Sequence, residues 1–129
     1  DDAMSKFVEA KAVFEAVGAA DTPHFGTLLS NMGAIHQEQG RFDDAMSKFV
    51  EAKAVSEAVG AADTPDFATL LNNMGMIHLE QGRFDDAMSK FAEAKAVFEA
   101  VGAADTPDFA GPLSNMGVIH QRQGRFDDA

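Results

Sequence analysis

The sequence predicts an all-α protein, a right-handed α-solenoid of stacked antiparallel helical hairpins with about six helices. Three observations predict it: a 42-residue internal repeat, apolar residues at helical spacing, and Gly or Pro at fixed places in each copy. The 129 residues hold the copies 1–42, 43–84 and 85–126, and residues 127–129 begin a fourth. The second copy matches the first at 36 of 42 positions and the third matches the second at 34. We therefore treat 1–129 as one array.

The first element within a copy is a long helix, which we call the second-type helix. In the central copy, apolar residues at 42, 45, 46, 49, 52 and 59 recur at helical spacing and predict a helix from Phe42 to Val59. Asp43 and Asp44 complement the positive end of its dipole. Gly60 suits the left-handed conformation that ends a helix.

The other element, the first-type helix, begins at Thr64-Pro65 and ends at Gly82. Thr64 is the predicted N-cap, and Pro65 occupies the first helical position, where its missing N–H is harmless. The short Gly-Arg-Phe junction then forces the next helix to run antiparallel. In the third copy Gly111-Pro112 replaces Thr69-Leu70, so we expect a late helix start there.

Stacking of neighbouring copies follows from this pattern, because one hairpin cannot bury its apolar faces alone. The helix 1–18 has no hairpin partner before it, and the helix that we expect to end near Gln123 has none after it. The two uncovered faces are complementary, so head-to-tail association is expected. The ends suggest a piece of a longer protein.

Composition excludes several classes of function. Twenty-one acidic against ten basic residues give a net charge of -11, which disfavours nucleic acid and anionic membranes and favours a basic partner. The chain has no apolar stretch of membrane-spanning length. It has no cysteine, which excludes disulfides and thiolate zinc sites and leaves the redox compartment open. No charged and then apolar leader supports secretion, and we expect a cytoplasmic location.

A family resemblance lies in residues 71–94, Leu-Asn-Asn-Met-Gly-Met-Ile-His-Leu-Glu-Gln-Gly-Arg-Phe-Asp-Asp-Ala-Met-Ser-Lys-Phe-Ala-Glu-Ala. With Gly75, Gly82, Ala87, Phe91 and Ala94 at their spacing, this stretch resembles a tetratricopeptide repeat (TPR). The 42-residue period is similar to the kinesin light chain class of that family. The resemblance implies a TPR-like superhelix that acts in protein binding.

Ten positions vary among the copies, and eight of them lie on or at the start of the first-type helix. Helical geometry places most of these eight on a stripe opposite the packed face. The resemblance implies that this stripe lines a concave groove that binds an extended peptide. The alternative is free drift on a solvated face. The candidate residues are Ser30, Asn72, Ser114, Ala34, Met76, Val118, Gln37, Leu79, Gln121, Glu38, Glu80 and Arg122.

Asn31, Asn73 and Asn115 lie at the edge of this stripe and do not vary. A carboxamide can pair with both the N–H and the C=O of an extended backbone, and related groove-binding repeats use an Asn in this way. The alternative is an Asn that bonds a neighbouring helix of its own solenoid.

Other chemistry finds little support in the sequence. The histidines at 36, 78 and 120 stand where the family usually has Tyr, on the packed face, and have no second ligand at i+4, so we expect core or half-buried histidines and no metal. The paired Asp residues lack a calcium loop. Ser56 stands where Phe14 and Phe98 occur, which predicts a cavity or water if that position is packed.

No asymmetric catalytic constellation is present, so we expect no enzyme and no cofactor. The leading hypothesis is a non-enzymatic scaffold that binds an extended peptide of a partner protein. The alternative is a structural spacer or self-associating array without a specific peptide ligand, including a consensus-like or designed fragment.

Overall fold

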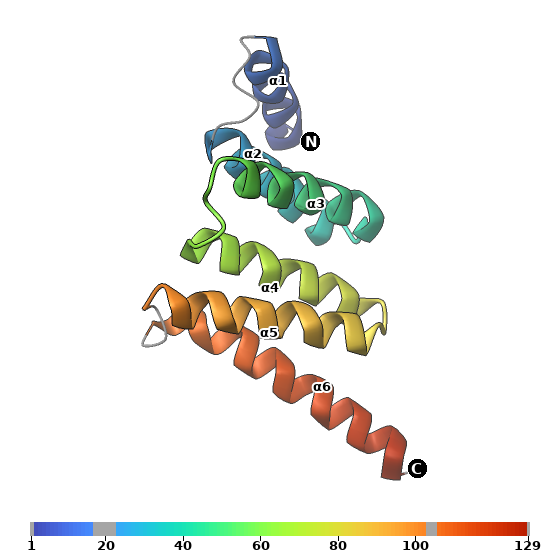
Figure 1. Cartoon of the computed structure of the whole chain (residues 1–129). Helices are drawn as coiled ribbons and strands as arrows, with labels where there is room; N and C mark the ends of the chain where they lie inside the picture. The colour runs from blue at the N-terminus through green and yellow to red at the C-terminus, as the bar shows by residue number, and fades with distance from the viewer. Residues whose placement is uncertain (1, 17–22, 103–105, 129) are drawn as a thin grey trace. The chain divides into compact units, whose positions relative to one another are not determined.

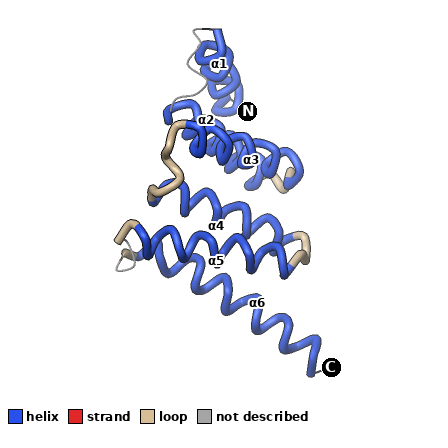
Figure 2. The backbone as a smooth tube through the Cα atoms, in the orientation of Figure 1, coloured by secondary structure: helices blue, strands red, loops and turns tan. Residues whose placement is uncertain are grey.

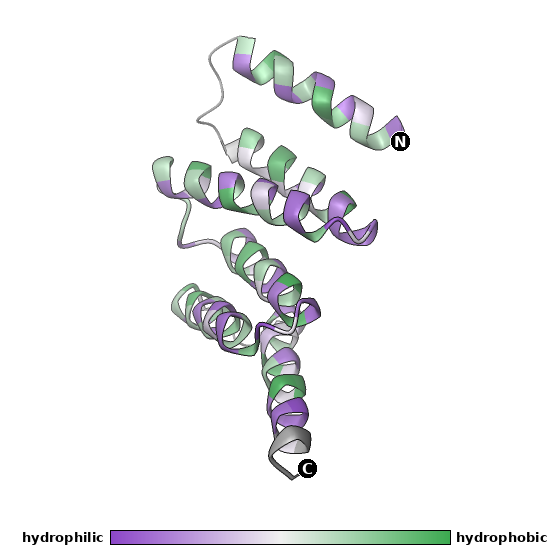
Figure 3. Ribbon diagram, turned by 90° about the vertical axis from the view of Figure 1, so that its right-hand side faces the viewer, coloured by the Kyte–Doolittle hydropathy of each residue, from purple (hydrophilic) through white to green (hydrophobic). Residues whose placement is uncertain are grey.

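The computed structural model describes residues 2–16, 23–102 and 106–128, and no side chains at 23, 24 and 125–128. The chain divides into two compact units, Asp1–Ala62 and Asp63–Ala129. Within the described ranges every element of secondary structure is a helix (Figure 2). The all-α prediction is therefore confirmed. Each helix carries both hydrophobic and hydrophilic residues, as helices packed on one side require (Figure 3).

The first unit contains α1 (Asp2–Ala16), α2 (Pro23–Glu38) and α3 (Phe42–Ala58) (Figure 1). The helices α2 and α3 form an antiparallel hairpin, and α1 contacts α2. Ala45, Phe49 and Ala52 on α3 are fully buried. Between α1 and α2 the rings of Phe14 and Phe25 lie 5.9 Å apart.

The second unit contains α4 (Pro65–Glu80), α5 (Phe84–Ala100), the short 3-10 helix η1 (Pro107–Phe109) and α6 (Ala110–Asp128). Here α4 and α5 form the hairpin, and α6 contacts both of them. Leu79, Ala87, Phe91 and Ile119 form a buried cluster that joins the three helices. Each hairpin thus pairs the first-type helix of one copy with the second-type helix of the next.

Two glycines set the helix spacing within the hairpins. A Cβ added at Gly33 would lie 2.6 Å from Cε1 of Phe49, and one at Gly75 would lie 2.6 Å from Cε1 of Phe91. A real Cβ does not approach a ring so closely, so only Gly lets these buried rings rest on the helix backbone. The ring of Phe in one helix and the Gly of its partner form the central contact of each hairpin.

The predicted helix ends are confirmed in the central copy. The backbone N–H of Phe67 donates to Oγ1 of Thr64 over 3.1 Å, and Pro65 occupies the first position of α4. Gly60 and Gly82 have φ values of +73° and +74°, the left-handed conformation that their places after a helix require. These ends are therefore fixed by local sequence.

The start of the third first-type helix is late, as Gly111-Pro112 predicts. Residues Pro107–Phe109 form a 3-10 turn, and the α-helix begins at Ala110, three residues after the position equivalent to Pro65. Pro112 cannot donate a backbone hydrogen bond in this region, and its side chain is fully buried. The altered dipeptide thus remodels one turn and leaves the rest of the helix intact.

The expected end of that helix near Gln123 is wrong, because α6 continues to Asp128. The residues Gln-Gly-Arg-Phe-Asp-Asp form a turn and a new helix at 39–44 and 81–86, yet they are helical at 123–128. At the first two places the following helix packs back onto its partner. Among the described residues, no helix packs back onto α6 after Gly124, and the segment there stays helical.

The position of Phe14, Ser56 and Phe98 is a packed one. Phe98 is buried and makes an edge-on contact with Phe109, the ring centroids being 6.2 Å apart. Ser56 is half-buried, and its Oγ lies 3.7 Å from the position of a Cβ built at Gly26. The central copy therefore lacks an aromatic ring at a site that the other two copies fill.

Candidate functional site

An exposed row of side chains runs along α4, formed by Thr69, Asn73, Met76 and Glu80. These residues follow one another at intervals of four, three and four, so they share one face of the helix. Thr69 and Glu80 are exposed, Met76 is 36% exposed and Asn73 is half-buried. Met76 is among the large apolar side chains that the described chain exposes. We call this row and its equivalents in α2 and α6 the outer stripe.

The outer stripe recurs on the other two first-type helices with different side chains. On α2 it consists of Thr27, Asn31, Ala34 and Glu38, and on α6 of Gly111, Asn115, Val118 and Arg122. Asn31, Glu38 and Arg122 are exposed. Val118 is half-buried because it packs against the cluster around Leu79. Nine of the fifteen candidate residues belong to the stripe, since they are the Asn, the Ala/Met/Val and the Glu/Arg positions.

The other six candidates occupy the positions of Asn72 and Leu79, which in the second unit face a neighbouring helix. Leu79 is only 8% exposed and lies in the cluster with Ile119 of α6. Oδ1 of Asn72 accepts a hydrogen bond of 3.2 Å from Nδ2 of Asn115 on α6. A helical projection groups these positions with the outer stripe because it does not show the neighbouring helix. Of their equivalents, Ser30 and Gln37 are half-buried, and Ser114 and Gln121 are exposed.

The three invariant Asn residues have different surroundings. Asn115 bonds a neighbouring helix of its own array, which is the alternative that the sequence left open. Asn31 is exposed and Asn73 is half-buried. Within the described part of the chain, neither of these two carboxamides has a hydrogen-bond partner. Asn31 and Asn73 therefore keep both donor and acceptor available, whereas part of the Asn115 carboxamide is in use.

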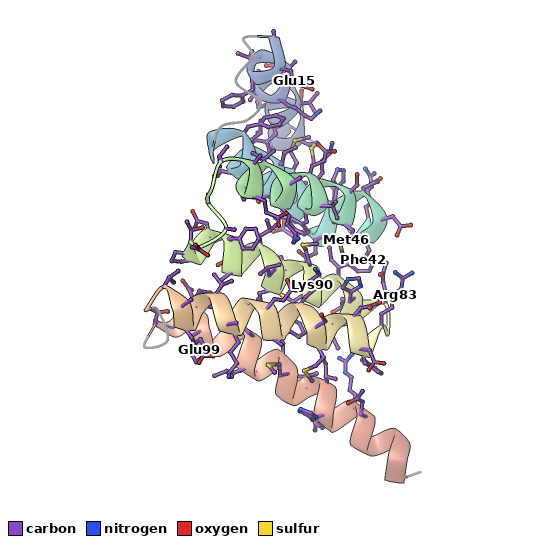
Figure 4. The ribbon with its side chains drawn as sticks, in the orientation of Figure 1. Glu15, Phe42, Met46, Arg83, Lys90 and Glu99 are labelled. Atoms are coloured by element: carbon purple, nitrogen blue, oxygen red, sulfur yellow. The ribbon has the colours of Figure 1, made fainter. Side chains whose placement is uncertain are left out.

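Charge is unevenly distributed between the two helix types. The second-type helices carry Lys–Glu pairs along their own surfaces, such as Lys95–Glu99 at 3.1 Å and Lys11–Glu15 at 3.4 Å (Figure 4 labels both glutamates). These pairs satisfy the lysines locally and contribute little to stability because they are exposed. The outer stripes of α2 and α4 end in the acidic Glu38 and Glu80, and that of α6 ends in Arg122.

The histidines on the packed face behave in two ways. His36 and His78 are half-buried as expected, and Nδ1 of each is buried without a hydrogen-bond partner in the described chain. The pKa of His78 is lowered, mainly by burial. The negative charge of Asp86 opposes this shift, whereas the positive charges of Arg83 and Lys90 add to it (Figure 4). The expectation of burial is wrong for His120, which is exposed because none of the described helices covers that face of α6.

Other features of the described chain add no second site. An open hollow beside the α4–α5 turn is lined by residues 82–86 and Gln123, which offer two carboxylates and one guanidinium. Among the residues that the structure describes, no group of three or more His, Cys, Asp or Glu is placed to hold a metal ion. None of the described helices is both long and apolar enough to cross a bilayer.

Comparison with known proteins gives the same repeat. Residues 24–100 match the family model described as tetratricopeptide repeat, and residues 110–129 match a second model with the same description. No curated protein matches the chain. Among solved structures the chain is similar to the crystal structure of BtubC (BKLC) from P. vanneervenii, with a TM-score of 0.75 and 23% sequence identity. The match covers 92% of this chain and 49% of that one, so this chain spans about half its length.

Proposed function

This chain belongs to the tetratricopeptide repeat family, in agreement with its resemblance to the kinesin light chain class, and we propose that it binds an extended, basic segment of a partner protein along its outer stripes. Repeats of this family are generally non-enzymatic scaffolds for protein interaction. Beyond this general role, we propose the form of the ligand, its charge and the residues that contact it. We also propose that residues 1–129 act as one array with the copies 1–42, 43–84 and 85–126.

The observation that carries the proposal is the composition of the outer stripe on α4. Asn73 offers a donor and an acceptor, Met76 offers an exposed apolar surface, and Glu80 offers a charge, all on one helix face. An extended backbone leaves its N–H and C=O groups unpaired, and a carboxamide bonds either of them whatever the peptide sequence. Met76 is flexible enough to fit side chains of various shapes. Asn is constant among the copies while its stripe neighbours vary, which suits a division between backbone and side-chain recognition.

Charge favours a basic ligand. The chain has a net charge of -11, and its second-type helices pair their lysines with their own glutamates. Glu38 and Glu80 on the outer stripes are exposed and make no ion pair within the described chain. A Lys- or Arg-containing segment would be attracted over several ångströms, so the affinity should fall as the salt concentration rises.

A displayed-peptide selection tests this function. The parent chain is compared with an Asn31→Ala/Asn73→Ala variant, and a Ser47→Ala/Ser89→Ala variant serves as the control because both serines are exposed on second-type helices. Circular dichroism first verifies that the three proteins are equally helical. We expect the parent and the control to enrich the same basic motif, and the double Asn variant to bind it at least about tenfold more weakly, since two hydrogen bonds are lost.

Two results would contradict this function. Equal binding by the double Asn variant would exclude these carboxamides as ligands. Failure of the parent to enrich any motif, in a library that works on another repeat scaffold, would favour the spacer function instead. Asn115 is left out of the variant because its bond to Asn72 supports the fold.

A further inference from the structure

The face of α6 that corresponds to the α5-covered face of α4 is bare. Leu113 is 41% exposed, whereas the equivalent Leu71 is 1% exposed. Gly117 and His120 are exposed, whereas Gly75 is buried and His78 is half-buried. A Cβ at Gly75 would collide with the ring of Phe91, but a Cβ at Gly117 would have no described atom within 4 Å. We call Leu113, Gly117 and His120 the open seat.

The helix that fits the open seat is present at the other end of the same chain. Residues 1–16 differ from residues 85–100 only at Val8 and Ala92, which are both exposed. Phe91 and Ala94 of α5 are fully buried, but the equivalent Phe7 and Ala10 of α1 are only half-buried. In its described residues, α1 buries none completely. The face of α1 that carries Phe7 and Ala10 therefore has the same residues as the face of α5 that packs on α4, but it is less buried.

We propose that α6 of one copy binds α1 of a second copy, antiparallel and in the register of the α4–α5 hairpin. The Phe7 ring of the second copy rests on Gly117, as Phe91 rests on Gly75. The contact joins two different faces, so each added copy exposes a new seat and a new α1. The chain then assembles head to tail.

Electrostatics support this pairing and its direction. Within the α4–α5 hairpin, Asp86 in the first turn of α5 lies close enough to His78 to act on its charge. The same register brings Asp2 of α1 beside His120 of the other copy. The acidic start of α1 thus meets His120 of α6, and a parallel arrangement would lose this pairing.

Sedimentation velocity on four proteins tests the proposal. Gly117→Ala blocks the seat with one methyl group, and Phe7→Ala removes the ring that fills it. Gly26→Ala is the control, because a Cβ at Gly26 meets its neighbours at an ordinary 3.6 Å. At about 0.15 M salt, where charge repulsion beyond about 8 Å is screened, we expect the parent and Gly26→Ala to form dimers and longer species as their concentration rises. Gly117→Ala and Phe7→Ala alone should stay monomeric.

An equimolar mixture of Gly117→Ala and Phe7→Ala gives the sharper result. Gly117→Ala keeps an intact α1 and Phe7→Ala keeps an intact seat, so the mixture should form dimers that do not grow further. Recovery of association in the mixture also shows that both variants are folded. The proposal is overturned if the parent is monomeric up to about 1 mM, if Gly117→Ala associates like the parent, or if the mixture stays monomeric.

Discussion

At the scale of the residue, four glycines on the first-type helices have different surroundings and so different tolerance for a side chain. Gly33 and Gly75 receive a buried Phe ring, Gly117 faces open space, and Gly26 lies at ordinary contact distance from Val55 and Ser56. Sequence alone assigns all of them the same cost for glycine within a helix. Whether a substitution by alanine raises the stability depends on the space that the neighbouring helix leaves beside the glycine.

Gly26→Ala and Gly33→Ala should therefore have opposite effects on stability. Gly26→Ala stabilises the fold by about 0.5–1 kcal/mol, because alanine reduces the conformational entropy of the unfolded chain and its methyl group fits beside Val55 and Ser56. Gly33→Ala destabilises it by about 1–3 kcal/mol, because the fully buried ring of Phe49 has no room to move. Thermal unfolding followed by circular dichroism measures both changes. A higher melting temperature for Gly33→Ala would contradict the close packing of Phe49.

His78 makes the stability of the second unit sensitive to acid. Burial holds its pKa below the ordinary value of about 6.5, with Asp86 opposing and Arg83 and Lys90 adding to the effect. As the pH falls, His78 therefore takes up its proton in the unfolded chain at a higher pH than in the folded chain. The stability that the neutral, buried His78 allows is present above pH 6.5 and is lost as the pH falls below it. Between pH 7.5 and 5.5 the melting temperature of His78→Gln should fall by less than that of the parent. An identical loss in the parent and in His78→Gln would contradict this, and His120→Gln, which changes an exposed His, is the matched control.

At the scale of the element, the sequence predicts helix ends where the signal is local and misses them where it is not. Thr64 and Gly60 act through their own backbone neighbourhood, and both were predictable. The turn at Gly82 has the same local sequence as the helical segment at Gly124, so its formation depends on the helix that follows. Leu79 shows the same limit for the candidate site. A helical projection places it among the exposed residues, and the neighbouring α6 buries it.

Adding a helix after α6 tests this dependence. A chain extended beyond Phe126 by a copy of residues 43–58 should form a turn at Gly124 and bury Gly117 under the new Phe. The added helix should slow amide hydrogen exchange in α6, because its seat becomes covered. Hydrogen exchange at residues 110–124 of the two chains measures the change. Unchanged exchange would show that the turn needs more than a following helix.

At the scale of the whole molecule, repetition both specifies the fold and separates the functions of its residues. Ala45 and Phe49, which are fully buried, are the same in every copy. The outer stripes combine one constant Asn with neighbours that differ among the copies. The second-type helices differ at two positions only, so variation is concentrated on the helices that carry the outer stripes. We therefore propose that the outer stripes bind the partner and that α1 and α6 carry the assembly.

The most direct measurement of the binding role follows the side-chain amides by NMR while the selected peptide is added. The chain has only four Asn residues, at 31, 72, 73 and 115, so their signals can be assigned by single substitutions. We expect the Asn31 and Asn73 carboxamide signals to shift most, and those of Asn72 and Asn115, which are bonded to each other, to shift less. Shifts confined to the second-type helices, with Asn31 and Asn73 unchanged, would contradict the account.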